Sequence, residues 1–248
     1  MINHTANIVE IFSSLQGEGI YVGEKMTFVR FGSCDMRCRY CDTLHALNLS
    51  EELHVEKEPG SGEFDAIENP IGVTKLCELL ERFDDEFISV TGGEPLAYAE
   101  FLAEWLPALS QKRRVLLETN GVKHAELERV LPYVHVVSMD IKLPSAAGCG
   151  KHWDAHLEFL RKTIVAGREV YVKLVVTDKT TDGDIQRAID IVTRINRFIP
   201  IVIQPASQTI TFQEAISKER LESVERLCSA YLEDVRVVPQ MHKEWGVL

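Results

Sequence analysis

The stretch Met-Thr-Phe-Val-Arg-Phe-Gly-Ser-Cys-Asp-Met-Arg-Cys-Arg-Tyr-Cys occupies residues 26–41 and joins two structural signals. Its first half, Met26 to Phe31, is a short apolar run typical of a buried strand. Its second half holds Cys34, Cys38 and Cys41 with the spacing Cys-x3-Cys-x2-Cys. A closed four-iron cluster needs four protein ligands, so three cysteines leave one iron open to a ligand from outside the protein. We expect the chemistry of the protein at that open iron.

The same cysteines allow a second interpretation. Together with His45 they form a Cys3His set, a common tetrahedral arrangement for structural zinc, and the protein would then be a zinc-stabilised binding module without catalysis. Zinc sites more often use two separated pairs of ligands. Three cysteines bunched in one loop at a strand end favour an iron-sulfur cluster that faces a ligand.

The rest of the chain alternates predicted strands with predicted helices. Apolar or β-branched runs predict strands at Met26 to Phe31, Phe87 to Thr91, Arg114 to Glu118, Val134 to Asp140, Glu169 to Val176, Pro200 to Gln204 and Val235 to Pro239. Helical patterns lie between them, at Val73 to Phe83, Tyr98 to Leu109, His124 to Leu131, Trp153 to Ala166, Asp182 to Phe198 and Phe212 to Leu232. This order predicts an α/β fold with a mainly parallel sheet or barrel, whose ligand site lies at the carboxyl ends of the strands.

Polar motifs follow four of these strands. They are Thr91-Gly92-Gly93-Glu94-Pro95, Glu118-Thr119-Asn120-Gly121, Ser138-Met139-Asp140-Ile141-Lys142 and Gln204-Pro205. Paired glycines let a ligand approach the backbone where a Cβ would collide, and Glu94 can accept a hydrogen bond from an ammonium group. A lone Gly-Gly would usually be an ordinary turn, but beside the cysteine run we interpret it as part of a binding site.

Composition restricts the classes of function. The chain has 248 residues, 45% hydrophobic and 26% charged, as expected of one globular α/β domain spanning residues 1–248. We find neither a membrane-length apolar stretch nor a signal peptide at Met1 to Glu10, and predict a cytoplasmic protein whose cysteines are free to bind metal. The net charge of −11 disfavours nucleic acid as a partner and favours a small substrate. We assign no role to Cys77, Cys149 or Cys228.

The segment Leu44 to Pro70 interrupts the alternation. It is rich in Glu and contains Pro59-Gly60-Ser61-Gly62, which predicts an irregular insertion with a short helix or a hairpin. A charged loop of this kind is usually only solvated, and the residues do not decide between that role, a lid and a docking surface.

The cysteine run with Tyr40, followed by Gly92-Gly93-Glu94-Pro95, resembles the radical S-adenosylmethionine (SAM) superfamily. Further motifs resemble the 7-carboxy-7-deazaguanine synthase family over nearly the whole chain. They are Glu10 to Gly19, Gly23, Phe28-Val29-Arg30-Phe31, Cys41-Asp42-Thr43, Glu118-Thr119-Asn120-Gly121 and the tail Gln240-Met241-His242-Lys243.

This resemblance implies a partial, open parallel (β/α)6 barrel, with residues 44–70 as a variable insertion. It implies a [4Fe-4S] cluster on the three cysteines and SAM on the open iron. After one electron from a flavodoxin-like donor, a SAM-derived radical would act on 6-carboxy-5,6,7,8-tetrahydropterin. Ring contraction and loss of ammonia would then give the 7-deazapurine precursor used for queuosine. A homodimer is also implied, and C2 dimers are the commonest assembly.

The resemblance also implies roles for single residues. Substrate contacts would come from Leu15, Gln16, Gly17, Glu18, Arg30, Thr91 and His242, with Leu15, Gln16 and Gly17 in a loop before the first barrel strand. SAM contacts would come from Gly93, Glu94, Ser138, Asp140, Lys142 and Gln204. Arg30 suits a carboxylate because guanidinium binds planar anions through two hydrogen bonds. Thr43 would give magnesium one hydroxyl ligand, although the residues alone favour a turn or helix cap there.

A glycyl-radical-enzyme activase is the strongest rival within this fold, since it shares the cysteine run but acts on a protein backbone. The Gln16-Gly17-Glu18-Gly19 loop and Thr43 favour the small pterin instead.

Overall fold

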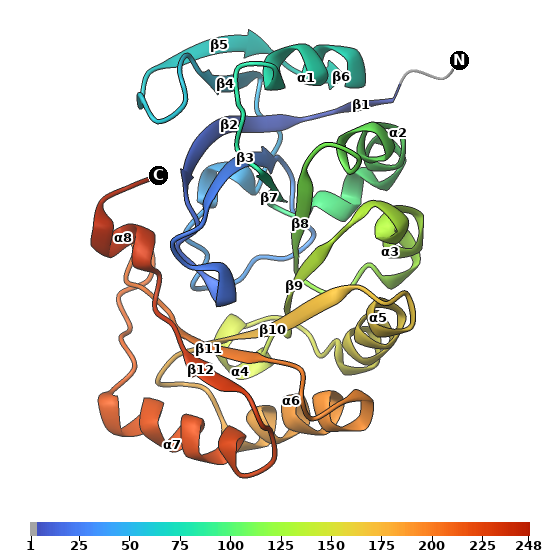
Figure 1. Cartoon of the computed structure of the whole chain (residues 1–248). Coiled ribbons are helices and arrows are strands. Elements are labelled where there is room, and N and C mark those ends of the chain that lie inside the picture. Colours follow the sequence, from blue (N-terminus) through green and yellow to red (C-terminus); the bar gives the residue numbers. More distant parts are fainter. Residues whose placement is uncertain (1–3) are drawn as a thin grey trace.

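The computed structural model describes residues 4–248, so the first three residues of the expected domain and of the Met1 to Glu10 segment lie outside the described residues. Ten strands of the described chain form one sheet in the order β12-β11-β10-β9-β8-β7-β3-β2-β4-β5, while β1 pairs with β6 (Figure 1). The bounds of the strands are β1 Thr5–Ala6, β2 Ile8–Leu15, β3 Lys25–Phe31, β4 Glu52–Glu56, β5 Phe64–Glu68, β6 Ile71–Gly72, β7 Phe87–Gly92, β8 Arg114–Thr119, β9 Val136–Asp140, β10 Glu169–Val176, β11 Ile201–Pro205 and β12 Val235–Val237.

Neighbouring strands from β3 through β7 to β12 are parallel, and helices connect most of them along the outer side of the curved sheet (Figure 1). The sheet does not close on itself, which confirms the predicted open parallel barrel. The helices are α1 Val73–Leu80, α2 Ala99–Leu109, α3 His124–Val130, α4 Pro144–Ala147, α5 Trp153–Val165, α6 Asp182–Ile195, α7 Lys218–Ser229 and α8 Met241–Trp245. No helix among the described residues is long and apolar enough to span a membrane.

The inner side of the sheet is apolar at one end and polar at the other. A buried cluster fills the end where the parallel strands begin, and consists of Phe12, Met26, Phe28, Phe87, Leu116, Val136, Tyr171 and Val202. Since side chains alternate along a strand, residues two and four positions later face the same way. In β9 this series is Val136, Ser138 and Asp140, and in β10 it is Tyr171, Lys173 and Val175. The strands therefore place an apolar floor beneath a polar cavity at their carboxyl ends.

One strand at the start of the sheet differs from the sequence prediction. Ile8–Leu15 forms β2, antiparallel to β3, so Leu15 ends a strand and the expectation that it lies in a loop was wrong. The insertion contains the antiparallel pair β4 and β5, which confirms a hairpin, and β4 also pairs with β2. The insertion thus extends the main sheet.

Four helix ends differ from the prediction by three or more residues, in α1, in α6 and at both ends of α7, and two of them have a clear local cause. The helix predicted from Phe212 begins only at Lys218, because the Ser217 hydroxyl caps it by accepting from the Arg220 amide. The helix predicted to reach Phe198 ends at Ile195, since Asn196 has an extended backbone. The hydrophobic spacing extends beyond the start of α7 and beyond the end of α6, so the local backbone and the Ser217 cap set these two bounds.

Candidate active site at the carboxyl ends of the strands

One cavity lies over the apolar floor and collects nearly all of the residues singled out from the sequence. The cysteines Cys34, Cys38 and Cys41 line it, together with Thr43, Leu15, Gln16, Gly17, Glu18, Arg30, Thr91, Gly93, Ser138, Asp140, Lys142, Gln204 and His242. Glu94 is the exception and lies outside the lining. Segments far apart in the sequence therefore meet at one place, as the parallel topology predicts.

The cysteine loop is held against the end of β7 by backbone contacts. Gly92 has a φ of +128°, a conformation that favours glycine, and a Cβ on Gly93 would lie 2.1 Å from the Ser33 carbonyl oxygen. The Gly93 amide donates to Phe31 O over 2.8 Å, and the Glu94 amide donates to Ser33 O over 2.9 Å. The glycine pair thus lets the strand end pack directly on the loop that carries the cysteines.

Two side chains from the loop after β8 also hold the cysteine loop. Asn120 Nδ2 donates to Asp35 Oδ1 over 2.9 Å, and Lys123 Nζ lies 3.2 Å from Asp35 Oδ2. Since Asp35 directly follows Cys34, these contacts fix the start of the ligand loop.

Glu94 organises the strand ends from outside the cavity. Its carboxylate is fully buried and accepts hydrogen bonds from the amides of Leu96 and Asn120 and from the Thr119 hydroxyl. Burial raises the pKa of Glu94 to about 7 despite these donors. In this structure the side chain therefore ties the end of β7 to the end of β8, and it does not line the cavity expected to hold SAM.

The three cysteine thiols do not converge on one point. Among residues 4–248, one group of three metal-ligating side chains has all its ligand atoms within 4.8 Å, and it contains no cysteine. A single zinc ion with bonds of about 2.3 Å would draw its sulfur ligands to about 3.8 Å from one another. His45, the fourth candidate ligand, lies 3.6 Å from Glu10 Oε1 instead. The three thiols and His45 therefore do not form a preassembled four-ligand zinc site among the described residues.

Burial raises the pKa of the Cys34 thiol to about 11 and also raises that of Cys41. In the metal-free chain these thiols are therefore protonated near neutral pH. Metal binding has to displace their protons, so cluster loading is coupled to pH.

Three buried oxygen atoms at the ends of β9 and β11 have no hydrogen-bond partner among the described residues. They are Ser138 Oγ, Asp140 Oδ1 and Gln204 Oε1, and all three residues line the cavity. Buried polar groups normally have partners, so these atoms fit a polar ligand such as SAM beside the cysteine loop. Lys142 Nζ lies 2.8 Å from Asp140 Oδ2, and although burial opposes it, Asp140 holds the pKa of Lys142 well above its ordinary value.

The loop after β2 forms the opposite wall of the cavity. Gln16 Nε2 donates to Glu118 Oε1 over 3.1 Å, and Gln16 Oε1 accepts from the Glu18 amide over 3.0 Å. Gly17 lies against the tail, where its Cβ would come within 2.3 Å of the His242 ring. Each of these side chains has a fixed direction before any ligand arrives.

Arg30 lines the cavity but is already paired. Its Nε donates to Glu10 Oε1 over 2.5 Å, and its guanidinium lies 5.7 Å from the centre of the Phe12 ring. Burial alone would raise the pKa of Glu10, but His45 and Arg30 lower it to about 2. Within the described chain, the terminal nitrogens of Arg30 make no hydrogen bond, which leaves them for an anion.

The tail folds back onto this wall. Gln240 Nε2 donates to Glu18 Oε1 over 2.7 Å and to Asp42 Oδ2 over 2.6 Å, while Met241 donates its amide to Gly17 O over 2.9 Å. Ser14 Oγ donates to Leu248 O over 2.9 Å. The tail therefore packs against the end of β2 and the loop after it, at the rim of the cavity.

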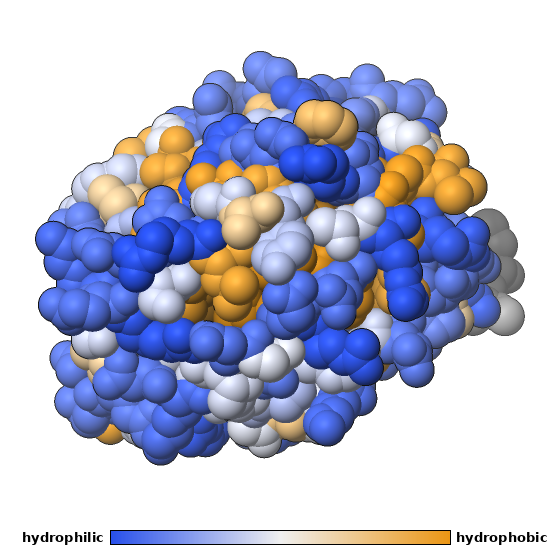
Figure 2. All heavy atoms as spheres, turned by 90° about the horizontal axis from the view of Figure 1, so that it is seen from below, coloured by the Kyte–Doolittle hydropathy of each residue, from blue (hydrophilic) through white to orange (hydrophobic). Residues whose placement is uncertain are grey.

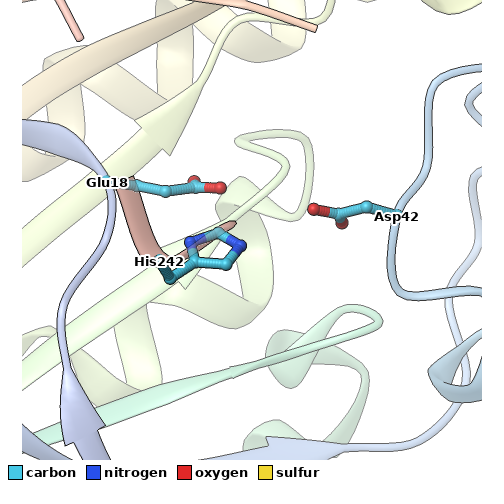
Figure 3. Close-up of side chains that lie close together, drawn as sticks. All are labelled: Glu18, Asp42 and His242. Carbon is cyan, nitrogen blue, oxygen red and sulfur yellow. The ribbon is translucent and has the colours of Figure 1, made fainter. Parts of the chain in front are cut away.

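Glu18, Asp42 and His242 point toward one another from three segments (Figure 3). The carboxylates already face ammonium groups, because Lys173 pairs with Glu18 and Lys243 Nζ lies 3.1 Å from Asp42 Oδ2. Burial opposes ionisation of Asp42, but Lys243 and Gln240 hold its pKa below the usual range. Because the ammonium groups of Lys173 and Lys243 already balance these carboxylates, Glu18, Asp42 and His242 form a hydrogen-bonded network and not a site for a further cation. Thr43 Oγ1 donates to Asp42 Oδ1 over 2.9 Å at its edge.

Two residues of this site were not predicted from the sequence. Lys173 is the only charged residue within the apolar run Val170 to Val176 of β10, and its register pairs it with Asp140. A single charge in an otherwise apolar strand could have indicated a functional side chain. Gln240 was noted only as part of a motif, and no spacing in the sequence predicts that it bridges Glu18 and Asp42.

Comparisons with known proteins agree with this geometry. The model of the radical SAM superfamily matches residues 28–192. The chain is 39% identical over 249 residues to the 7-carboxy-7-deazaguanine synthase of Geobacter sulfurreducens, with 98% of each chain covered. It is 35% identical over 266 residues to the enzyme of the same name from Methanothermobacter thermautotrophicus, with 100% of each covered.

Among solved structures, the crystal structure of QueE from Escherichia coli shares the fold, with a TM-score of 0.66 at 21% sequence identity, covering 97% of this chain and 95% of that one. The superfamily match includes the cysteine loop and the strands β7, β8, β9 and β10 that end at the cavity. The similarity to the curated relatives continues through the β4 and β5 hairpin and the tail. The chain therefore belongs to the 7-carboxy-7-deazaguanine synthase family of the radical SAM superfamily.

Proposed function

We propose that this protein converts 6-carboxy-5,6,7,8-tetrahydropterin to 7-carboxy-7-deazaguanine with release of ammonia, for the synthesis of 7-deazapurines such as queuosine. The atoms of the pterin balance those of the two products, so the conversion needs no net oxidant. The observation that carries the proposal is a single cavity with a three-cysteine loop on one wall and the Gln16 to Glu18 loop on the other. Such a cavity can hold a cluster-bound cofactor and a small planar substrate side by side.

The cysteine wall suits the cofactors. When bound, the reduced [4Fe-4S] cluster and SAM supply the carbon-centred radical that starts the ring contraction. Cys34, Cys38 and Cys41 hold the cluster in this proposal. Ser138, Asp140, Lys142 and Gln204 bind SAM, as their unpartnered oxygens and the buried ammonium support. Gly93 and Glu94 hold the methionine end of SAM in this proposal, with Gly93 in the cavity lining and Glu94 behind it.

The opposite wall suits the pterin. Gln16 and Glu18 present an amide and a carboxylate to its nitrogen-rich edge, with Leu15, Gly17 and Thr91 as the surrounding contacts. Arg30 binds the carboxylate of the substrate through its terminal nitrogens while Glu10 holds its Nε. His242 contacts the substrate from the tail.

Magnesium enters the proposal through Thr43. Its hydroxyl lies in the cavity lining two residues after Cys41, and Asp42 fixes its direction. Magnesium keeps most of its ligands as water or substrate oxygens, so one protein hydroxyl is a sufficient anchor.

A flavodoxin-like electron donor and a homodimer complete the proposal. A one-electron donor is needed because the cluster has to be reduced before each cleavage. On the face shown in Figure 2 apolar residues lie among hydrophilic ones, and the homodimer in this proposal comes from the family resemblance alone. Light scattering of the purified protein measures the mass directly, and a monomer at micromolar concentration would count against the dimer. Free clustered thiols suit a reducing, cytoplasmic location.

The function is tested with protein purified and reconstituted without oxygen. The reconstituted protein should be brown. Given SAM, a strong reductant, magnesium and carboxytetrahydropterin, it should release 7-carboxy-7-deazaguanine and ammonia in equal amounts. Cys38→Ala should lose iron and all turnover. The matched control is Cys77→Ala, at an exposed cysteine, which should lose neither. A fully loaded wild type that forms no product would refute the function, and stoichiometric zinc without sulfide would restore the binding-module interpretation.

A further inference from the structure

Lys173 projects from the middle of the sheet into the cavity, between the two walls described above. It lies on β10 at a register position opposite Asp140 of β9, and its side chain is only 7% exposed. Its ammonium pairs with Glu18 Oε2 and lies 4.0 Å from Asp140 Oδ1. It therefore stands at the boundary between the residues assigned to SAM and those assigned to the pterin.

The hydrogen bonds of Lys173 are incomplete. An ammonium has three N–H donors, yet among the described residues Lys173 Nζ makes one hydrogen bond, to Glu18. The distance to Asp140 is too long for a second, and Asp140 already binds Lys142 through its other oxygen. A buried charge with two free donors and a place in the cavity lining is suited to a ligand acceptor.

Glu18 complements this donor. Each of its carboxylate oxygens has one protein partner, Lys173 or Gln240, and each can still accept a further hydrogen bond. Burial alone would raise the pKa of Glu18, but Lys173 lowers it, so the carboxylate is ionised and accepts only. A donor and an acceptor therefore stand side by side at the cavity surface.

The lactam edge of a pterin presents the complementary pair, a ring N–H next to a carbonyl oxygen. Resting on the function proposed above, we propose that Lys173 is a specificity-determining residue that donates to the carbonyl at position 4, while Glu18 accepts from the neighbouring N–H. A 4-amino pteridine places donors where Lys173 needs an acceptor. Sites built on hydrogen bonds discriminate strongly against ligands that leave buried groups unpaired.

The alternative is that Lys173 only neutralises Glu18 and Asp140. A counter-ion would strengthen or weaken the binding of all pteridines together. If Lys173 instead donates a hydrogen bond to the lactam edge, its removal changes the ratio of affinities for two ligands that differ at position 4. That ratio separates the two roles.

The probes are 6-carboxypterin and 2,4-diaminopteridine-6-carboxylate, titrated by their fluorescence into anaerobic, reconstituted protein with SAM present. The wild type should prefer the 4-oxo ligand by at least about tenfold. Lys173→Met should reduce this preference to about threefold or less, and Lys173→Arg, which keeps the donors, should retain it. The control Lys179→Met removes an exposed lysine paired with Glu214 and should keep the wild-type ratio.

If Lys173→Met does not fold, Glu18→Gln is compared with the double variant Glu18→Gln/Lys173→Met, which removes both charges of the buried pair. Both variants lack the Glu18 carboxylate, so the difference between them isolates Lys173, and the double variant should show a clearly smaller preference for the 4-oxo ligand than the single variant. An unchanged ratio after loss of Lys173 overturns the inference while wild-type turnover of carboxytetrahydropterin leaves the function standing. No turnover by the loaded wild type overturns both.

Discussion

Replacing Gly93 by Ala tests whether the contact between strand β7 and the cysteine loop holds the cluster site together. The added Cβ would lie 2.1 Å from Ser33 O and 2.7 Å from Ala46 O, both backbone atoms that cannot rotate away. The backbone must separate, which breaks the bonds from Gly93 N to Phe31 O and from Glu94 N to Ser33 O. Two such bonds contribute about 2 kcal/mol in total. Displacing packed backbone adds about 1–3 kcal/mol.

We therefore expect Gly93→Ala to lower the free energy of unfolding of the metal-free protein by about 3 kcal/mol or more, measured by urea denaturation. Iron and sulfide per chain after reconstitution should fall as well, because Cys34 directly follows the displaced Ser33. The matched control is Gly183→Ala near the start of α6, where a Cβ meets nothing closer than 4.0 Å and stability should hold or rise. A Gly93→Ala protein with the stability and iron content of the wild type would refute this reasoning.

Three further predictions concern the same region. Because the folded-state pKa of Glu94 is raised from 4.5 to about 7, the folded state binds more protons than the unfolded state between these values. The free energy of unfolding of the metal-free protein should thus fall by up to about 3 kcal/mol more than that of Glu94→Gln as the pH rises from 4.5 to 7. If urea denaturation gives the two proteins parallel profiles against pH, this prediction is contradicted. The His156 ring accepts from Lys142 N and donates to Gly121 O, and so links the two loops. His156→Ala should therefore lower the free energy of unfolding, measured in urea, by about 2–5 kcal/mol, and His156→Gln should lower it less. Equal losses in the two variants would argue against this link. Thr43→Ala should weaken the dependence of turnover on magnesium, and an unchanged titration curve would remove Thr43 as a ligand.

The sequence predicted the parallel part of the fold well because each strand is a compact apolar run. Glu169–Val176 has the predicted bounds, and the other parallel strands differ by one or two residues at an end. Strand β2 was missed because Glu10, Ser13 and Ser14 interrupt its apolar residues. Its place in the sheet depends on pairing with β3 and β4, which are contacts that no local pattern encodes.

The candidate site shows the same division. Residues at strand ends could be placed in one cavity from topology alone, and Ser138, Asp140 and Lys142 line it as expected. The direction of a side chain could not be predicted in this way. Glu94 turns toward the end of β8 because the Thr119 hydroxyl and the Asn120 amide both donate to its carboxylate, and Arg30 turns its Nε to Glu10. Both choices are made by neighbours distant in the sequence.

The contact of the tail with the loop after β2 has a practical consequence for how this protein is handled. Leu248 lines the cavity and its carbonyl is bound by Ser14, so any polypeptide that continues beyond Leu248 leaves from the rim of the site. An affinity tag fused there would compete with substrate for the same opening and would pull on Gln240 and its partners. Strand β1 begins at Thr5, which is not part of that rim. Kinetic work on this protein is therefore better begun with the tag at the amino-terminal end.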